Sequence, residues 1–162
     1  MKYFHPIYRR ALRRSTGVTR AGVSAFGLLV LAVPAAATCY IQSANGVDFG
    51  VYDVFSSAPN HTGIGSFSIK CSGGSSATVK LSNGQSNTFA PRVLRSGANR
   101  LTYNLYVSAA RNLVWGDGTG GTSLVAIKKN GAVNLDIFGS IPAGQDAAVG
   151  LYTDTIIMTV EF

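Results

Sequence analysis

The sequence is poor in the side chains from which most metal and enzyme sites are built. It has two histidines, two cysteines and one tryptophan, and only 13% of its 162 residues are charged. A Cys-x-x-Cys pair and the acidic spacing of a calcium loop are both missing. We therefore expect no bound metal and no cofactor.

Catalytic groupings are missing as well. Nucleophilic catalysis needs a base beside the nucleophile, and His61, the only histidine after His5, lies in an expected polar turn. The segment 116–121 is glycine-rich but lacks the lysine and the helix of a phosphate-binding loop. Acid–base catalysis by paired carboxylates is not expected either, because the aspartates lie in turns or on opposite faces of an expected strand. We predict that the protein is not an enzyme.

Long apolar runs are absent except for one near the N-terminus. Ala21 to Val33 is about 13 residues long, too short for a membrane-spanning helix, and follows a segment that contains five arginines. Ala35, Ala36 and Ala37 then supply a small-residue cleavage site. We predict a signal peptide at residues 1–37, with a retained anchor as the alternative, and one secreted domain at residues 38–162.

Strong net charge is also absent once the signal is removed. The whole chain carries +7, but six of its 14 basic residues precede residue 38, whereas all seven acidic residues follow it. The remaining charge is +1, and Lys128-Lys129 is the only basic pair left. Nucleic-acid binding needs a clustered basic face, so no nucleic-acid partner is expected.

The two cysteines, Cys39 and Cys71, both survive the predicted cleavage. In an oxidising compartment an even pair is usually a disulfide. A bridge between positions 39 and 71 would contribute roughly 3–4 kcal/mol to the free energy of unfolding in the chain-entropy picture. Zinc is the competing interpretation, and it fails on the number of available ligands.

Helical periodicity is missing from residues 38–162, and short alternating segments separated by glycine-rich turns predict strands instead. The alternation is clear in residues 66–71, where Phe67, Ile69 and Cys71 share a face, and in residues 101–107. Further strands are expected at 48–52, 79–81, 112–115, 133–138 and 151–162. The pattern predicts an all-β antiparallel sandwich, with a closed barrel as the alternative.

The expected last strand lacks the features that usually protect a sheet edge. It contains no proline or lysine, and Glu161 is the only charge in its last eight residues. A central strand flanked on both sides would explain this. An edge that receives a strand from another chain would explain it equally well.

The order of several short motifs resembles the spore coat protein U family, which includes the Csu-type (archaic) chaperone–usher pilus subunits. The resemblance rests on the order of these motifs over residues 39–162. The motifs are Cys39, Phe49-Gly50-Val51-Tyr52, Ile69-Lys70-Cys71, Leu101-Thr102-Tyr103-Asn104-Leu105-Tyr106, Trp115-Gly116-Asp117-Gly118, Phe138-Gly139-Ser140-Ile141-Pro142-Ala143-Gly144-Gln145 and Gly150-Leu151-Tyr152-Thr153-Asp154-Thr155.

The resemblance implies an immunoglobulin-like sandwich that lacks its last strand. A periplasmic chaperone would lend that strand, and the N-terminal extension of another pilin subunit would replace it as an outer-membrane usher assembles the fibre. The disulfide would join the first strand to the second. The acceptor and chaperone-contact residues would be Ile156, Met158, Val160 and Phe162.

Cleavage after Ala37 would leave Thr38 alone before Cys39, whereas polymerising members of the family carry a donor segment there. The sequence therefore indicates a terminal or minor fibre subunit that accepts a strand and is displayed at the cell surface. A stand-alone secreted coat or matrix protein is the alternative. A carbohydrate-binding surface lined by Trp115 and the tyrosines is less favoured, because such residues usually form core and cross-strand contacts.

Overall fold

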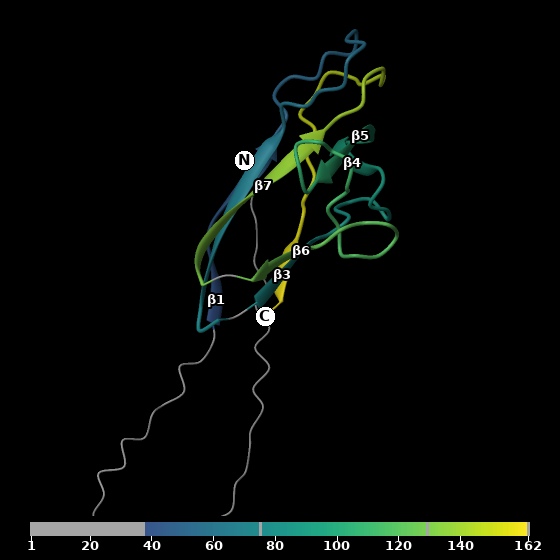
Figure 1. Ribbon diagram of the computed structural model, residues 1–162. Coiled ribbons are helices and arrows are strands. Elements are labelled where there is room, and N and C mark those ends of the chain that lie inside the picture. Colours follow the sequence, from purple (N-terminus) through teal and green to yellow (C-terminus); the bar gives the residue numbers. More distant parts are fainter. Residues whose placement is uncertain (1–37, 75, 129, 162) are drawn as a thin grey trace, which may run out of the picture.

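The computed structural model describes residues 38–74, 76–128 and 130–161, which form eight strands in two antiparallel sheets (Figure 1). The predicted signal peptide and Phe162 lie outside these residues. The strands are β1 (Thr38–Asp48), β2 (Ile64–Ser72), β3 (Ser76–Leu81), β4 (Arg92–Ser96), β5 (Asn99–Tyr106), β6 (Val125–Lys128), β7 (Gly131–Ser140) and β8 (Met158–Glu161). The described residues contain no helix long and apolar enough to cross a membrane. The expected all-β sandwich is confirmed.

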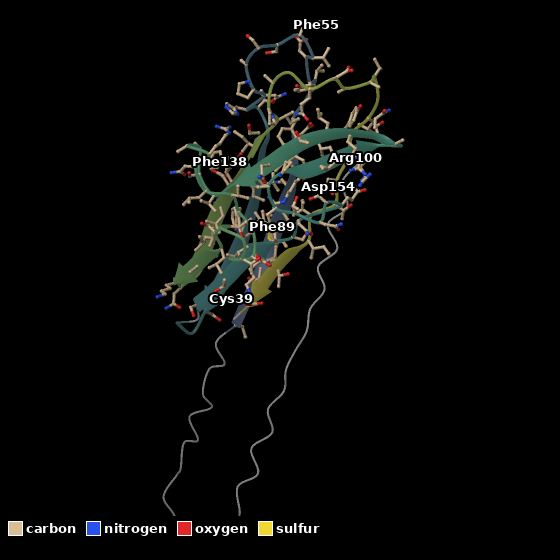
Figure 2. The ribbon with its side chains drawn as sticks, turned by 90° about the vertical axis from the view of Figure 1, so that its right-hand side faces the viewer. Cys39, Phe55, Phe89, Arg100, Phe138 and Asp154 are labelled. Carbon is tan, nitrogen blue, oxygen red and sulfur yellow. A yellow bond between two sulfur atoms is a disulfide. The ribbon has the colours of Figure 1, made fainter. Side chains whose placement is uncertain are left out.

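The larger sheet has the order β1-β2-β7-β5-β4 and the smaller sheet the order β6-β3-β8. The chain first passes between the sheets after β2, through Gly73 and Gly74, whose positive φ angles of 70° and 73° suit glycine. In Figure 1 the smaller sheet lies at the lower end of the sandwich, where β1 begins. Figure 2 places Cys39 at this lower end and Phe55 at the opposite end.

The core lies between the sheets and follows the alternation expected from the sequence. Phe67 and Ile69 on β2 and Val79 on β3 are at most 2% exposed. Trp115 is 1% exposed, and its ring centroid lies 5.9 Å from that of Phe67. The indole Nε1 of Trp115 donates a hydrogen bond to the Val79 carbonyl at 3.1 Å. Trp115 is therefore a core residue, as expected, and it ties the two sheets together.

Two expected strands are wrong or reduced. Residues 49–52 form a loop, because Gly50 has a φ of 63° and the Asn60 side chain bonds the carbonyls of Phe49 and Val51. The segment 112–115 makes only isolated bridges, at Val114 and Trp115. At 49–52 side-chain bonds from Asn60 replace a ladder, and at 112–115 the pairing is limited to single bridges with Tyr106 of β5 and with Ser123.

The expected last strand is also shorter than its pattern suggested, because the ladder with β3 covers Met158–Glu161 alone. The preceding residues 151–157 are extended but bond to two different partners. Thr153 exchanges two backbone hydrogen bonds with Arg95 of β4, each 2.9 Å long, and Ile157 bonds to Ser82. The C-terminal segment therefore contacts both sheets.

The residue pattern did not indicate β1, β4 or β6. The polar segment around Asn45 and Gly46 gives β1 no apolar alternation. The strand is held by a ladder to β2 that has two register shifts. Cys39 lies opposite Cys71 in that ladder, and the two form a disulfide. The bridge joins the start of β1 to the end of β2, which is the pairing that the resemblance implied.

Candidate functional site

The candidate site is the outer edge of β8, which borders the smaller sheet. β8 pairs with β3 on one side, in the register Thr78↔Glu161 to Leu81↔Met158. Among the residues that the structure describes, no strand pairs with its other side. Unpaired strand edges bind other strands readily, so this edge can add a further strand.

The hydrogen bonds at the start of β8 reveal which backbone groups face the empty side. The Ser82 amide donates to the Ile157 carbonyl at 2.9 Å, so these residues form a hydrogen-bonded pair. Such pairs alternate along an antiparallel ladder, and Thr159 and Glu161 therefore direct their N–H and C=O groups toward β3. The N–H and C=O groups of Met158 and Val160 point away from β3, toward the empty side.

The same alternation orients the side chains of this segment. Ile156, Met158 and Val160 are half-buried and pack against the core. Ile157 points the other way and is 48% exposed. Three predicted acceptor residues therefore share one inward-facing row that the two sheets cover only in part.

β1 forms the other border of the partly covered region. Figures 1 and 2 together place β8 across the sandwich from β1. Residues paired across a ladder point to the same face, so Ala44, paired with the buried Phe67, faces inward. Ala44 is nevertheless exposed, and Ile41, paired with the fully buried Ile69, is only half-buried. The core therefore lacks cover along β1 as well as along β8.

Half-buried aliphatic residues also mark the larger sheet at this end. Val133 and Leu135 of β7 pair with Ile69 and Phe67, so they face inward, yet both stay half-buried. Ile137, one alternation further along β7, is 3% exposed. The inward face of the sandwich is thus fully covered toward the end that holds Phe55, and only partly covered toward the end where β8 lies.

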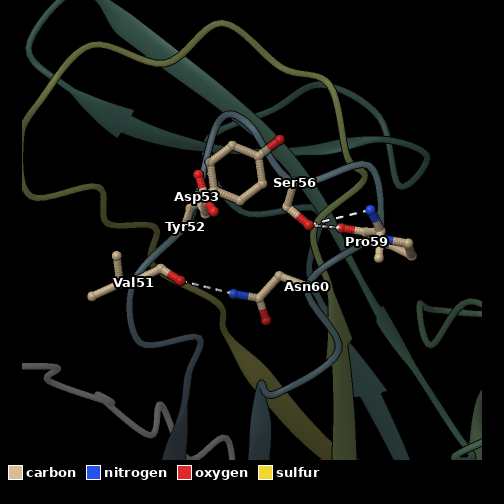
Figure 3. A pocket seen from close by; sticks show the side chains of 7 residues that line it. Val51, Tyr52, Asp53, Ser56, Pro59 and Asn60 are labelled. Atoms are coloured by element: carbon tan, nitrogen blue, oxygen red, sulfur yellow. Dashed lines mark hydrogen bonds between the residues drawn. The ribbon is translucent and has the colours of Figure 1, made fainter.

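A second feature is a shallow pocket of about 220 Å³ in the loop that follows β1 (Figure 3). Asn60 Nδ2 donates to the Val51 carbonyl at 3.2 Å, and Ser56 Oγ donates to the Ala58 carbonyl at 3.0 Å. Asp53 is the only lining residue that is charged at neutral pH, and its carboxylate accepts the Phe55 amide at 2.9 Å. These bonds shape the loop, and the pocket brings together no acid, base and nucleophile.

Beside this loop, the Arg111 side chain holds a backbone segment in place. Arg111 has a positive φ of 54°, and its Nη2 donates to the His61 carbonyl at 2.7 Å. Partial burial and the neighbouring Arg111 lower the pKa of His61. The described residues contain no group of three or more histidine, cysteine, aspartate or glutamate side chains placed to hold a metal ion.

Residue patterning missed two contributors to the candidate site. Ala44 carries no signal in the sequence, because its inward orientation follows from the β1–β2 register. Ser82 bonds the start of β8 through its amide and its hydroxyl, and only its position after the alternating segment 79–81 could have suggested a role. The predicted acceptor residue Phe162 lies outside the described residues.

Comparison with known proteins gives consistent matches. The sequence model described as the Spore Coat Protein U domain matches residues 25–159. Protein U of Myxococcus xanthus is 34% identical over 139 residues, which cover 76% of this chain and 77% of that protein.

A solved structure matches the fold over most of the chain. It is the pre-assembly complex of the chaperone CsuC and the tip adhesion subunit CsuE, from the archaic chaperone-usher Csu pili of Acinetobacter baumannii. The TM-score is 0.56 at 24% sequence identity. The match covers 78% of this chain but only 40% of the matched one, so this chain corresponds to less than half of it.

Proposed function

The chain belongs to the Spore Coat Protein U domain family, and on this basis we propose that it is a secreted structural subunit of a surface fibre, completed by a strand from another chain. The observation that carries the proposal is the edge of β8, where Met158 and Val160 direct backbone groups to an empty side and half-buried side chains to the core. A fibre subunit needs this kind of edge, because strand addition joins chains through backbone hydrogen bonds.

The incoming strand would complete the backbone and the core together. Its backbone would pair with the free groups of β8, and its inward side chains would cover Ile156, Met158 and Val160. Fully burying one aliphatic side chain contributes about 1.5–3 kcal/mol. A few such side chains would therefore contribute an amount comparable to the net stability of a domain, about 5–15 kcal/mol.

The proposed partners are a periplasmic chaperone, an outer-membrane usher and other pilin subunits. A matching solved structure holds its subunit in a pre-assembly complex with a chaperone, which supports the chaperone as the first partner. A half-covered core exposed to water favours aggregation, and a lent strand would prevent this during passage through the periplasm. The mature protein would then be displayed at the cell surface.

The place in the fibre rests on the predicted signal peptide, residues 1–37. With cleavage after Ala37, β1 would begin at the first residue of the mature protein, and no donor segment would precede Cys39. Such a subunit accepts a strand and offers none, which suits a terminal or minor position. N-terminal sequencing of the exported protein tests this point, and a mature chain that starts well before Thr38 would contradict it.

The central experiment supplies the missing strand artificially. A strand of about seven alternating valine and threonine residues is joined after Phe162 through a short Gly-Ser linker; we call it the tethered strand. The control, the charged tether, carries aspartate in place of valine. The tethered strand is expected to raise the thermal midpoint by about 5 °C or more and to protect the Met158 and Val160 amides from hydrogen exchange. Equal midpoints for the two tails would overturn the proposal.

A stand-alone secreted coat protein is the second candidate, and the family's description as the Spore Coat Protein U domain favours it. In that case the described sandwich would be stable without a partner. The two candidates differ in the exchange of the Met158 and Val160 amides in the protein without any added strand. Slow exchange of both amides in a soluble monomer would favour the coat protein.

A further inference from the structure

One residue interrupts the apolar row that faces the core along the C-terminal segment. Tyr152, Asp154, Ile156, Met158 and Val160 are all half-buried, alternating with exposed residues. Four are aromatic or aliphatic, whereas Asp154 carries a carboxylate. A charged group on an inward-facing row costs free energy unless it is fully hydrogen-bonded, so its contacts show what holds it there.

Both carboxylate oxygens of Asp154 are bound by residues from other parts of the fold. Oδ2 accepts the Tyr103 hydroxyl of β5 at 2.7 Å. Oδ1 accepts the Gln85 amide at 2.9 Å and the Thr155 amide at 2.7 Å. Gly84 has a φ of 67°, and a side chain there would collide with the Asp154 carboxylate. The loop after β3 therefore closes around this group.

The Tyr103 hydroxyl is a dependable donor in this place. Tyr103 is 3% exposed, and burial together with the Asp154 carboxylate raises its pKa. The phenol therefore keeps its proton at neutral pH. Its ring packs edge-on against Phe49, with centroids 5.7 Å apart, so the hydroxyl is held in position by the core.

The loop that meets Asp154 is itself fixed by a buried cation. Arg92 of β4 is fully buried, and its Nε and Nη2 donate to the Ser82 carbonyl at 3.0 and 2.8 Å. Nη2 also donates to the Trp115 carbonyl at 2.6 Å, and Nη1 donates to Asn104 Oδ1 at 2.8 Å. Ser82 in turn bonds Ile157. Asp154 thus attaches the C-terminal segment to a part of the molecule that cannot easily shift.

β8 itself makes few contacts that determine its register, although the bonds of Thr153 to Arg95 and of Ile157 to Ser82 hold the segment before it. It has four residues and one neighbouring strand, and within the described part of the chain its one ion pair joins Lys80 to Glu161 at 2.7 Å. A slide by two residues would keep an aliphatic side chain facing the core at most positions, since Ile156, Met158 and Val160 alternate. The alternation between core and solvent rules out a slide by one residue but does not rule out a slide by two.

We propose that Asp154, held by Tyr103, is a positioning residue that fixes the register of β8 on β3 while the opposite edge of β8 is empty. The inference deepens the proposed function and rests on it, because a strand that awaits a second neighbour depends more on this attachment than a strand that already has two. A buried polar group that determines register is a well-attested use of such groups. Once a donor strand is present, its own ladder and side chains hold β8 in place as well.

The test compares Tyr103→Phe with Tyr152→Phe in the full-length chain after export, each with and without the tethered strand. Tyr152 is a matched control, because its hydroxyl donates to the Ala148 carbonyl in the same segment and does not contact Asp154. We expect Tyr103→Phe to accelerate exchange of the Thr159 and Glu161 amides about tenfold without the tethered strand, and about threefold or less with it. Tyr152→Phe should change neither.

Cross-strand NMR contacts provide the second measurement. Without the tethered strand, Tyr103→Phe should add contacts between Thr159 and Thr78, which a two-residue slide would bring together, to the native contacts between Thr159 and Lys80. Equal acceleration in both forms, or native contacts alone, would overturn the positioning role. If the tethered strand leaves the Met158 and Val160 amides unprotected, the proposed function fails, and the contacts of Thr159 still decide the role of Asp154.

Discussion

Ala44 and Phe67 are paired across the β1–β2 ladder and face the same side, yet Phe67 is 2% exposed and Ala44 is open to solvent. Phe67 lies on β2, which has a neighbouring strand on each side, whereas Ala44 lies on the edge strand β1. The difference locates the place where the inner face of the sandwich loses its cover.

Ala44→Glu is expected to block strand addition while leaving the protein without a partner almost unchanged. The glutamate would point into the region that an added strand must occupy, where its charge would be desolvated. The tethered strand should then raise the thermal midpoint no more than the charged tether does. Without a tail, the free energy of unfolding should change by about 0.5 kcal/mol or less, as measured by urea denaturation.

Gln42→Glu is the matched control on the same strand, because Gln42 is exposed and contacts Ser68 on the outer face. This variant should keep the full increase in thermal midpoint that the tethered strand gives. Loss of the gain in both variants would show that added charge on β1 acts generally, and would contradict the assignment of Ala44 to the border of the site.

Val160→Asp tests the inward row of β8. The carboxylate would face the core beside Val79, its paired residue on β3, which is fully buried. We expect a loss of about 1–3 kcal/mol in the free energy of unfolding and no gain from the tethered strand. Thr159→Asp, on the exposed face of the same strand, should keep most of the unfolding free energy and most of the stabilisation by the tethered strand. Met158→Asp should behave like Val160→Asp, and normal strand addition in both would show that the faces are assigned wrongly.

Cys71→Ser removes the bridge between the start of β1 and the end of β2. The sequence separation of 32 residues corresponds to roughly 3–4 kcal/mol in the chain-entropy picture, a large part of the net stability of a domain. The yield of exported protein and the midpoint of urea denaturation should both fall strongly. The double variant Cys39→Ser/Cys71→Ser should match the single one, and a midpoint equal to that of the native protein would refute the prediction.

Stability should decline in alkaline solution through Tyr103. Burial, together with Asp154, raises the pKa of this phenol in the folded protein. A raised pKa contributes stability that is complete below the unfolded pKa of about 10 and is lost as the pH rises above it. Above that pH the native protein should lose up to about 1.4 kcal/mol per pH unit more than Tyr103→Phe does. Parallel curves of unfolding free energy against pH for the two proteins would contradict the assignment.

Much of the fold could be predicted from residue periodicity, because the central strands alternate clearly between core and solvent. Leu101, Tyr103 and Leu105 are each at most 3% exposed, as their spacing indicates. β1 could not be found in the same way. Its border position leaves Ala44 and Asn45 exposed, so no apolar alternation is required of it, and the ladder with β2 alone decides its conformation.

The polar interior could not be predicted either. Arg92 is fully buried because the carbonyls of Ser82 and Trp115 happen to converge on it, and their positions depend on the complete fold. The sequence predicts aspartates in turns, and Asp154 accepts the amide of the adjacent Thr155 as turn aspartates commonly do. Its bond to Tyr103, 51 positions away along the chain, leaves no trace in the local sequence.

The C-terminal segment bonds to β4 at Thr153 and to β3 from Ser82 onward, and this has a mechanical consequence. Tension that reached β8 from an added strand would act along the strand direction, across the hydrogen bonds to β3, and would strain several of these bonds at once. The same tension would be divided between the two sheets, because the segment is bonded to a strand of each. A domain joined at this edge would therefore resist pulling as a unit, and β8 could not be peeled away one residue at a time.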